Sequence, residues 1–359
     1  MNKINIYLFF LTNKYLIVNF IIISLFILFI NLLELSRVLP GENKNVFNYV
    51  YLSFLKYPSI LNEIIPFVTV VSISFLIRSL INNNELVSMR NLGYSIFDIF
   101  LPIAASVFIT GLIFLILINP ISTMMASKYD NKIDNRNVNL HSIRISNNEM
   151  WIKNEIDNQN SSFINIKNID LQTMNARDIK ILLISNQSNT LILAESGEFK
   201  ENIFSLKNVK FYNFLDENFN KLESLQLKIN FNKENILNSI SKYKLIPFYK
   251  YINHTQTLSK FNLYSKEIGL YYLSEILKPL FIVVLAFVIV GFTSKFQRNE
   301  NFFKVLFIAI SIGFIIFLLK EIISKLTINL SMNIYVSYLV IFLIPLFIGL
   351  YQVIKIENE

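Results

Sequence analysis

The sequence predicts an α-helical membrane protein with six transmembrane helices, three on each side of an inserted all-β domain. Of its 359 residues, 53% are apolar and only 16% are charged, and the mean hydropathy is +0.47. A soluble domain carries about 25% charged residues. The charges are also unevenly spread, since residues 128–278 hold 36 charged side chains while other long stretches hold none. This distribution excludes a disordered chain and a purely soluble enzyme.

Three candidate spans precede the polar insert. Residues 15–33 form a stretch of 19 residues without a charge. A helix of that length covers roughly 29 Å, which is enough to cross the hydrocarbon core. No small-residue cleavage site follows, so we expect a retained helix rather than a cleaved signal peptide. The second span is predicted at Ile64–Ile77, and the third runs from Ile99 into the 120s, interrupted only by Pro120.

Three further spans are predicted after the insert, at Pro279–Ser294, at Val305–Leu319 and within Thr327–Ile354. Six spans place both chain ends on one side of the membrane. Lys and Arg in short loops favour the cytoplasm, and this rule predicts cytoplasmic termini with the insert outside. The cytoplasmic set is Lys3, Lys14, Arg78, Arg90, Lys295, Arg298, Lys304 and Lys355, and the opposite set is Arg37, Lys44, Lys56, Lys320 and Lys325.

The insert has the pattern of an antiparallel β-domain. Residues 225–231 alternate apolar and polar side chains, which is the period of a half-buried strand. Similar runs separated by polar turn clusters predict a sandwich or roll; they lie at 150–153, 163–171, 179–184, 191–199 and 204–215. From about Asn235 the pattern becomes helical. The expected domains are helices one to three in 1–127, the β-domain in 128–245, and a connector helix with helices four to six in 246–359.

The sequence lacks the motifs of several enzyme classes. It has no cysteine, which excludes disulfides, thiolate metal sites and cysteine nucleophiles. It has no Gly-rich P-loop, and His141 and His254 have no carboxylate pair at ligand spacing. The charges near the spans lie at span ends, whereas a coupling ion needs ligands in mid-span. We therefore expect no catalytic residue, no metal and no cofactor, and energy supplied by a partner.

The formal net charge of +8 has two explanations. It fits an anionic partner, and it fits equally well the Lys-rich, Asn-rich and Ile-rich usage of an AT-rich genome. A nucleic-acid partner is not expected. The charge balance therefore decides less about function than the position of the insert does.

Residues 84–95, between the second and third spans, predict a short helix on the cytoplasmic side. Asn84 can cap its N-terminus. Glu85 lies in the first turn, where the helix dipole favours an acidic side chain. Gly93 fits the position after the helix, which requires a left-handed backbone. These three residues define the expected ends of the helix.

The same helix is expected to be amphipathic. Leu86, Met89 and Leu92 recur at helical spacing on one face, which leaves Glu85 and Arg90 available to a partner. An interfacial helix that only covers the membrane edge fits the pattern equally well. The residues alone leave these two alternatives open.

Residues 85–95 resemble the E-L-x-x-M-R-x-x-G-x-S signature of the LptF/LptG permeases, the membrane subunits of the bacterial lipopolysaccharide-transport ABC exporter. Residues 63–67 resemble the family's E-L-L-P-F motif, and Asn119-Pro120 resembles the end of its third span. Lys278-Pro279-Leu280 resembles the start of its fourth span, and residues 292–298 resemble the basic loop that follows. The resemblance covers essentially the whole chain.

The resemblance implies a transport subunit without catalytic activity. The insert is then a periplasmic β-jellyroll, and the short helix is a coupling helix that docks into a cytoplasmic LptB-like ATPase dimer. The other implied partners are a paralogous LptF-like permease and a bitopic periplasmic LptC-like protein. Residues 150–153 resemble the LptG member of the pair, which favours an LptG-like chain. The implied coupling residues are Glu85, Leu86, Met89, Arg90 and Gly93.

The implied cargo is lipopolysaccharide, taken laterally from the outer leaflet of the inner membrane. The family often places several basic residues at the end of span one, where this chain has Glu34 and Arg37. Arg37 fits a contact with lipid phosphate, or equally an interfacial anchor. An apolar jellyroll interior suits acyl chains, although the same residues fit a closed core. The expected lining is Ile164, Ile166, Leu191, Leu193, Phe204 and Leu206.

Two other functions fit the same pattern. One is a membrane-anchored sensor or scaffold whose extracytoplasmic β-domain binds envelope ligands and needs no ATPase. The other is an ABC exporter subunit for a different lipid, which shares the mechanism but not the cargo.

Overall fold

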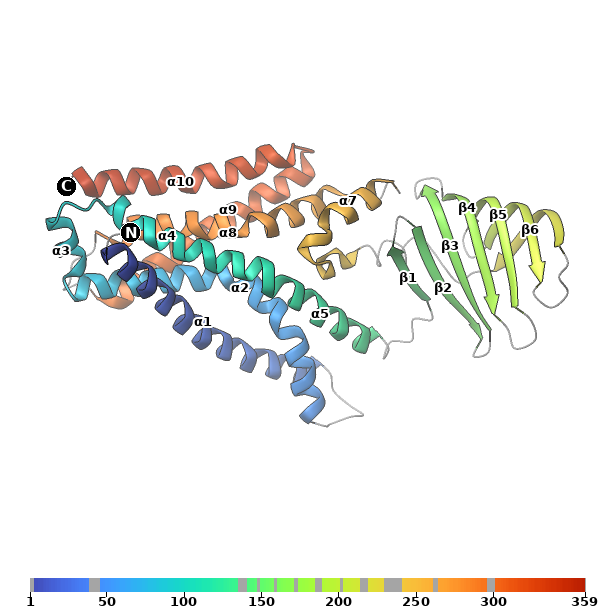
Figure 1. Cartoon of the computed structure of the whole chain (residues 1–359), viewed down its shortest axis with the longest axis horizontal. Coiled ribbons are helices and arrows are strands. Elements are labelled where there is room, and N and C mark those ends of the chain that lie inside the picture. The colour runs from blue at the N-terminus through green and yellow to red at the C-terminus, as the bar shows by residue number, and fades with distance from the viewer. Residues whose placement is uncertain are drawn as a thin grey trace. The chain divides into compact units, whose positions relative to one another are not determined.

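The structure is a computed structural model, and it describes residues 3–38, 46–134, 141–146, 149–157, 160–170, 174–184, 189–200, 203–213, 219–228, 241–260, 264–295 and 301–358. The chain divides into two compact units. One unit comprises Met1–Tyr129 with Gly269–Glu359, and the other is Asp130–Ile268. Figure 1 shows that the first unit is built of helices and that the second contains the sheet.

Six helices in the described residues are long and apolar enough to cross a membrane, three before the sheet and three after it. This confirms the predicted three-plus-three arrangement around an inserted β-domain. The helices of the first unit include α1 (Lys3–Val38), α2 (Val46–Asn82), α3 (Glu85–Asn91), α4 (Ile96–Ile113), α8 (Lys266–Thr293), α9 (Phe302–Asn329) and α10 (Ile334–Asn358).

The helices are longer than the charge-free stretches that predicted them. The second span was expected from Ile64, but α2 begins at Val46, and the fourth was expected from Pro279, but α8 begins at Lys266. The predictions stopped at charged residues. Two of those charges, Glu275 and Lys278, pair with each other inside the helical unit, so they do not interrupt a helix.

The third span passes Pro120 without ending there. After α4 the helix continues through a π-helical turn, η1 (Phe114–Ile118), into α5 (Asn119–Asp134). Proline lacks an N–H to donate to the preceding turn and its ring needs extra room, which a π turn provides. Asn119-Pro120 therefore does not end the helix, contrary to expectation.

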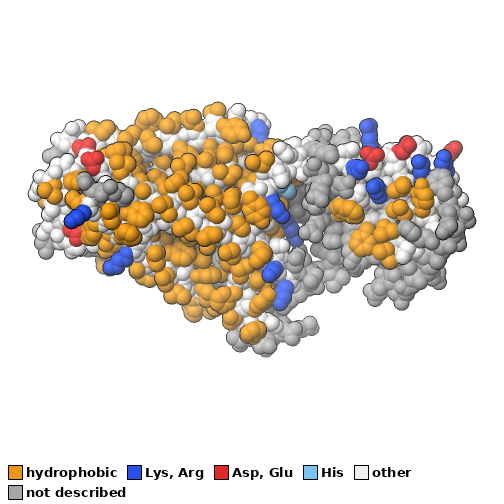
Figure 2. Space-filling view, in the orientation of Figure 1, with side chains coloured by type: hydrophobic (Ala, Val, Ile, Leu, Met, Phe, Trp, Pro, Cys, Tyr) orange, Lys and Arg blue, Asp and Glu red, His pale blue; other side chains and the backbone are white. Residues whose placement is uncertain are grey.

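The helices pack through a continuous apolar core that includes Leu76, Leu80, Ile103 and Ile289, all fully buried. A Cβ atom at Gly111 would lie 2.7 Å from the backbone of Pro279, so α4 and α8 approach closely because this residue has no side chain. On the face drawn in Figure 2, hydrophobic side chains cover the helical unit and charged ones gather at its two ends. That distribution suits a surface in contact with lipid.

In its described residues, the second unit holds one antiparallel sheet of seven strands, paired in sequence order. The strands are β1 (His141–Ser146), β2 (Glu149–Asp157), β3 (Asn160–Asp170), β4 (Asn175–Ile184), β5 (Asn189–Lys200), β6 (Ile203–Asn213) and β7 (Phe219–Lys228). Short helical segments follow the sheet, namely η2 (Ser241–Leu245), η3 (Phe248–Lys250) and α7 (Tyr251–Lys260). The prediction of an inserted all-β domain is confirmed.

Each described strand pairs with the next one in the chain, so the sheet is a meander. The pairings between non-consecutive strands that a jellyroll adds do not occur among these strands. Short connections explain the meander, because adjacent strands joined by a hairpin lie side by side. The strand β1 was missed, since its only apolar residues are Ile143 and Ile145.

Alternation buries one face of the sheet, but the predicted lining is only partly right. Ile164, Phe204 and Leu206 are fully buried, as expected. Leu191 and Leu193 are only half-buried, because their neighbour Ile192 is the residue that is fully buried. Ile192 pairs with Ile181 of β4, which is also buried. Other predicted residues, namely Lys44, Leu171, Leu215, Ile229, Phe231, Asn235 and Arg298, lie outside the described residues.

Candidate functional site

The first candidate site is the link between α2 and α4, which contains the seven-residue helix α3. Leu86 and Met89 are buried, with 4% and 6% exposure, and belong to the core of the helical unit. The same core cluster contains Leu8 of α1 and Val353 of α10. The predicted helix is therefore present, and two apolar side chains anchor it.

The end of α3 is a Schellman motif with Gly93 at its left-handed position. The Gly93 backbone has φ +88, and its N–H donates to the Arg90 carbonyl at 2.9 Å. The Tyr94 N–H donates to the Met89 carbonyl at 3.1 Å. This pair of bonds satisfies carbonyls that the last turn would otherwise leave open. The sequence placed this glycine correctly.

Two details of α3 differ from expectation. Asn84 is the capping residue, but its backbone is left-handed, with φ 57, and its side chain makes no capping bond. Leu92 was assigned to the apolar face but is 70% exposed. The reason is that Leu92 follows the last helical residue, Asn91, so helical spacing no longer directs its side chain toward the core. The exposed apolar residues of this link are therefore Val87 and Leu92.

Glu85 is half-buried and accepts two hydrogen bonds. The hydroxyl of Tyr7 in α1 donates to its Oε2 at 2.8 Å. The Asn83 side-chain amide donates to its Oε1 at 3.2 Å. The carboxylate is thus held at the N-terminus of α3, where the helix dipole favours a negative charge.

Arg90 is exposed, but its guanidinium also has a partner within the chain. Its Nη2 donates to the carbonyl of Ile356 in the last turn of α10, at 3.2 Å. The next residue, Glu357, accepts the backbone N–H of Ile96 at 3.1 Å. The link is therefore tied to the last turn of α10 on both sides of Gly93.

Replacing Gly93 with alanine is expected to loosen the end of α3. No atom lies within 4 Å of a Cβ built at this position, so the cost is backbone strain of about 1 kcal/mol. Hydrogen exchange of residues 85–94 should become faster. Gly291→Ala is the matched control, because that helical position offers ordinary contacts at 3.4 Å. Equal exchange in both variants would contradict the role given to Gly93.

The second candidate site, Glu34 and Arg37, lies at the opposite end of α1 from Tyr7. The Glu34 carboxylate lies 3.6 Å from the Lys56 ammonium of α2, and both side chains are partly exposed. An exposed ion pair of this kind contributes little to stability. Arg37 is exposed in the last turn of α1. The structure does not bring Arg37 together with Glu85.

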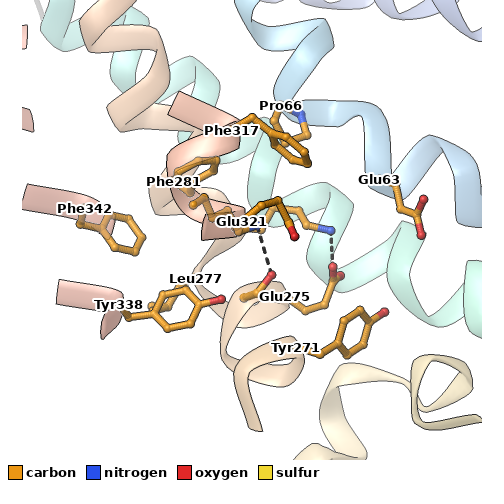
Figure 3. A pocket seen from close by; sticks show the side chains of 13 residues that line it. Glu63, Pro66, Tyr271, Glu275, Leu277, Phe281, Phe317, Glu321, Tyr338 and Phe342 are labelled. Carbon is orange, nitrogen blue, oxygen red and sulfur yellow. Dashed lines mark hydrogen bonds and ion pairs between the residues drawn. The ribbon is translucent and has the colours of Figure 1, made fainter. Parts of the chain in front are cut away.

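A third site was missed by the sequence prediction, and Figure 3 shows it. It is a cavity of about 270 Å³ within the helical unit. Figure 3 shows Glu63 and Pro66 of α2 on one side, Glu275 and Tyr271 of α8 below, and Tyr338 and Phe342 of α10 opposite. Lys278, Lys320 and Glu321 also line it. The cavity therefore combines five charged residues with aromatic walls.

Glu275 is the centre of a buried hydrogen-bond network in this cavity wall. It is 5% exposed and accepts the side-chain amides of Asn62 at 2.9 Å and Asn119 at 3.1 Å. The Lys278 ammonium pairs with its other oxygen and also donates to the Asn62 carbonyl at 3.1 Å. The network joins α2, α5 and α8. Glu275 and Lys278 are one helical turn apart, whereas Asn62 and Asn119 are far from them in sequence. The Glu-x-x-Lys spacing was therefore the local signal that the sequence offered.

Lys320 of α9 lies on the other side of the cavity. Its ammonium donates to the Ser274 hydroxyl at 3.4 Å and lies 5.2 Å from the centre of the Phe281 ring. The Tyr338 hydroxyl donates to the Leu270 carbonyl at 3.1 Å. A cation on an aromatic face is a weaker partner than a carboxylate. Of the two cations in the lining, Lys320 thus has weaker oxygen partners than Lys278, which pairs with the Glu275 carboxylate.

An apolar cavity of about 320 Å³ adjoins the polar one. The two share Glu63, Pro66 and Phe317 in their linings. The second is otherwise lined by apolar residues and one glycine, namely Ile64, Phe67, Val70, Leu285, Ile310, Gly313 and Phe314. Together they have the character of an amphiphile site, with charged groups at one end and hydrocarbon at the other. No cluster that could hold a metal ion occurs in the described part of the chain.

Comparison with protein families gives one match. The family model described as "Lipopolysaccharide export system permease LptF/LptG" matches residues 6–355. A comparison with curated proteins gives no match. The family model spans both the helical unit and the sheet.

Proposed function

Because this chain belongs to the LptF/LptG family of lipopolysaccharide export system permeases, we propose that it is the permease subunit of an ABC exporter. The subunit extracts lipopolysaccharide from the outer leaflet of the inner membrane and passes it to a periplasmic bridge. A separate cytoplasmic LptB-like ATPase dimer supplies the energy. An LptF-like paralogue and a bitopic LptC-like protein complete the complex, with this chain as the LptG-like member.

The surface of α3 is the main support for an ATPase partner. Leu86 and Met89 anchor the helix in the core, whereas Val87 and Leu92 are 52% and 70% exposed. Two exposed apolar side chains beside an acidic residue support the docking surface that we propose for α3. We assign Glu85 as the polar contact and Gly93 as the residue that fixes the helix end. If α3 docks on a cytoplasmic ATPase, both termini lie in the cytoplasm and the sheet lies in the periplasm.

The two adjoining cavities support an amphiphilic cargo. The apolar cavity suits a hydrocarbon chain, and Lys320 offers a cation to an acidic group at its polar end. The exposed apolar side of α1, including Phe26 and Phe29, suits contact with lipid or with the paired permease. This arrangement supports the proposal of a carrier for a lipid with a charged headgroup.

The direct test is reconstitution of the purified chain with its partners in liposomes. The chain should co-purify with an ATPase, and lipopolysaccharide should raise ATP turnover. Cells depleted of the chain should fail to deliver lipopolysaccharide to their surface. Normal delivery after depletion would favour the alternative of a sensor or scaffold with an extracytoplasmic ligand-binding domain. Stimulation by a different lipid only would assign the same mechanism to another cargo.

Arg37 is expected to contact phosphate of the cargo. A photo-crosslinking residue at position 37 should capture radiolabelled lipopolysaccharide. The control position is Tyr335, which is 76% exposed at the start of α10 and is therefore on the same side of the membrane. Capture of phospholipid alone at position 37, or equal capture at both positions, would contradict the assignment.

A further inference from the structure

Both ends of the chain hold the link between α2 and α4. In Figure 1 the N-terminus and the C-terminus lie at the same end of the helical unit as α3. Near the N-terminus, the Tyr7 hydroxyl donates to Glu85 at 2.8 Å. Near the C-terminus, Arg90 donates to the Ile356 carbonyl and Glu357 accepts from the Ile96 backbone. Three contacts between residues far apart in sequence thus converge on one short segment.

The contacts with α10 are matched in charge as well as in geometry. The Arg90 cation lies at the C-terminal end of α10, where the helix dipole favours a positive charge. The Glu357 carboxylate lies at the first residue of α4, where the dipole favours a negative charge. Each side chain therefore stabilises the end of another helix, and the two together clamp the link.

The helix α3 depends on these contacts because it is short. Seven residues are far fewer than the roughly 12–15 that an isolated helix needs in water. Leu86 and Met89 pack in a cluster with Leu8 of α1 and with Val353 and Ile356 of α10. The orientation of α3 is thus set by the two terminal helices as much as by its own residues.

We propose that Tyr7 and Glu357 are positioning residues of the coupling helix. They hold α3 and its Glu85 carboxylate in the orientation that docks on the ATPase, and they do so from α1 and α10. This inference rests on the proposed function. The helix α1 also carries Arg37, in its last turn at the opposite end from Tyr7, so Tyr7 joins the coupling residue to the helix that bears Arg37.

Two measurements on the full chain test this proposal. The variants are Tyr7→Phe, which removes only a hydroxyl, and Glu357→Gln, which removes only a charge. The first measurement is hydrogen exchange of residues 85–94 in the chain alone. Exchange should be about fivefold faster in Tyr7→Phe, the effect of one lost hydrogen bond. The matched controls, Tyr335→Phe and Glu223→Gln, change exposed side chains elsewhere and should leave exchange unaltered.

The second measurement is ATP turnover of the reconstituted complex with and without lipopolysaccharide. Both variants should retain the ATPase on purification and lower the ratio of stimulated to basal turnover about fivefold. Unchanged exchange, or faster exchange with an unchanged ratio, would overturn the positioning role. If lipopolysaccharide does not stimulate ATP turnover with the wild-type chain, the proposed function is overturned instead. The exchange comparison needs no ATPase, so it would still decide whether both chain ends hold α3.

Discussion

Replacing Glu275 with alanine is expected to destabilise the helical unit by about 3–5 kcal/mol, the cost of leaving a buried charge without its partner. The Lys278 ammonium would lose its carboxylate partner. This loss is costly because the Lys278 and Glu275 side chains are only 11% and 6% exposed. The amides of Asn62 and Asn119 would lose their common acceptor as well. Because this network joins three helices, the loss should reduce cooperativity as well as stability. Thermal unfolding in detergent should shift downward by about 5–10 °C.

A double variant separates the charge from the hydrogen bonds. Glu275→Gln with Lys278→Met removes both charges but keeps an acceptor for Asn62 and Asn119. A buried ion pair is often replaced by neutral groups at little cost, so most of the stability should return. Lys278→Met alone should remain destabilised, because it leaves the Glu275 carboxylate buried. Equal stability of Glu275→Ala and the unvaried chain would show that the network does not hold the helices together.

The helical unit could be predicted because its signal is local. A charge-free stretch predicts a membrane span when the stretch is long enough to cross the hydrocarbon core, and all six helices were found in this way. Their bounds were wrong where charged residues have partners inside the helical unit, as Glu275 and Lys278 do. Glu275 was outside the predicted span because its partners Asn62 and Asn119 are 213 and 156 residues away. The Glu-x-x-Lys spacing is a local sign of the ion pair, but no local pattern reveals the two asparagines.

The sheet and the helix α3 were also predicted correctly only where their sequence signals are local. Alternation predicted six strands, but it could not show that the strands form one meander, since pairing depends on connections and register. At α3 the turn residue Gly93 was found from its backbone requirement, whereas Leu92 was assigned to the wrong face. Its exposure follows from the point at which the helix ends, one residue earlier. Helical spacing predicts faces only within the helix.

The candidate site residues were predicted as surface groups, and the structure gives some of them internal partners. Arg90 was expected to be available to a partner, yet it donates to α10. Tyr7 had no expected role, although its hydroxyl lies 2.8 Å from Glu85. These contacts join residues 78 and 266 positions apart. They became visible only when the fold brought both chain ends to one place.

Replacing Glu85 with alanine is expected to lower lipopolysaccharide-stimulated ATP turnover about tenfold, the cost of one hydrogen bond to a charged group at an interface. The variant should fold, because alanine is the best helix former and the anchors Leu86 and Met89 stay buried. Comparison of stimulated with basal turnover in liposomes is the measurement. The ATPase should still co-purify, since Val87 and Leu92 keep the apolar part of the docking surface.

The matched variant Glu85→Gln shows which property of the side chain matters. Glutamine has no charge and keeps one acceptor oxygen, which can take the hydrogen bond from the Tyr7 hydroxyl, while its amide nitrogen replaces the oxygen that accepts from Asn83. If the ATPase contact is an ion pair, Glu85→Gln should fail as Glu85→Ala does, while hydrogen exchange of α3 stays near that of the unvaried chain. If Glu85 only steadies α3 through Tyr7, glutamine should restore turnover. Full stimulated turnover in both variants would exclude α3 as the coupling helix, because the remaining exposed surface of α3 has no other acidic side chain.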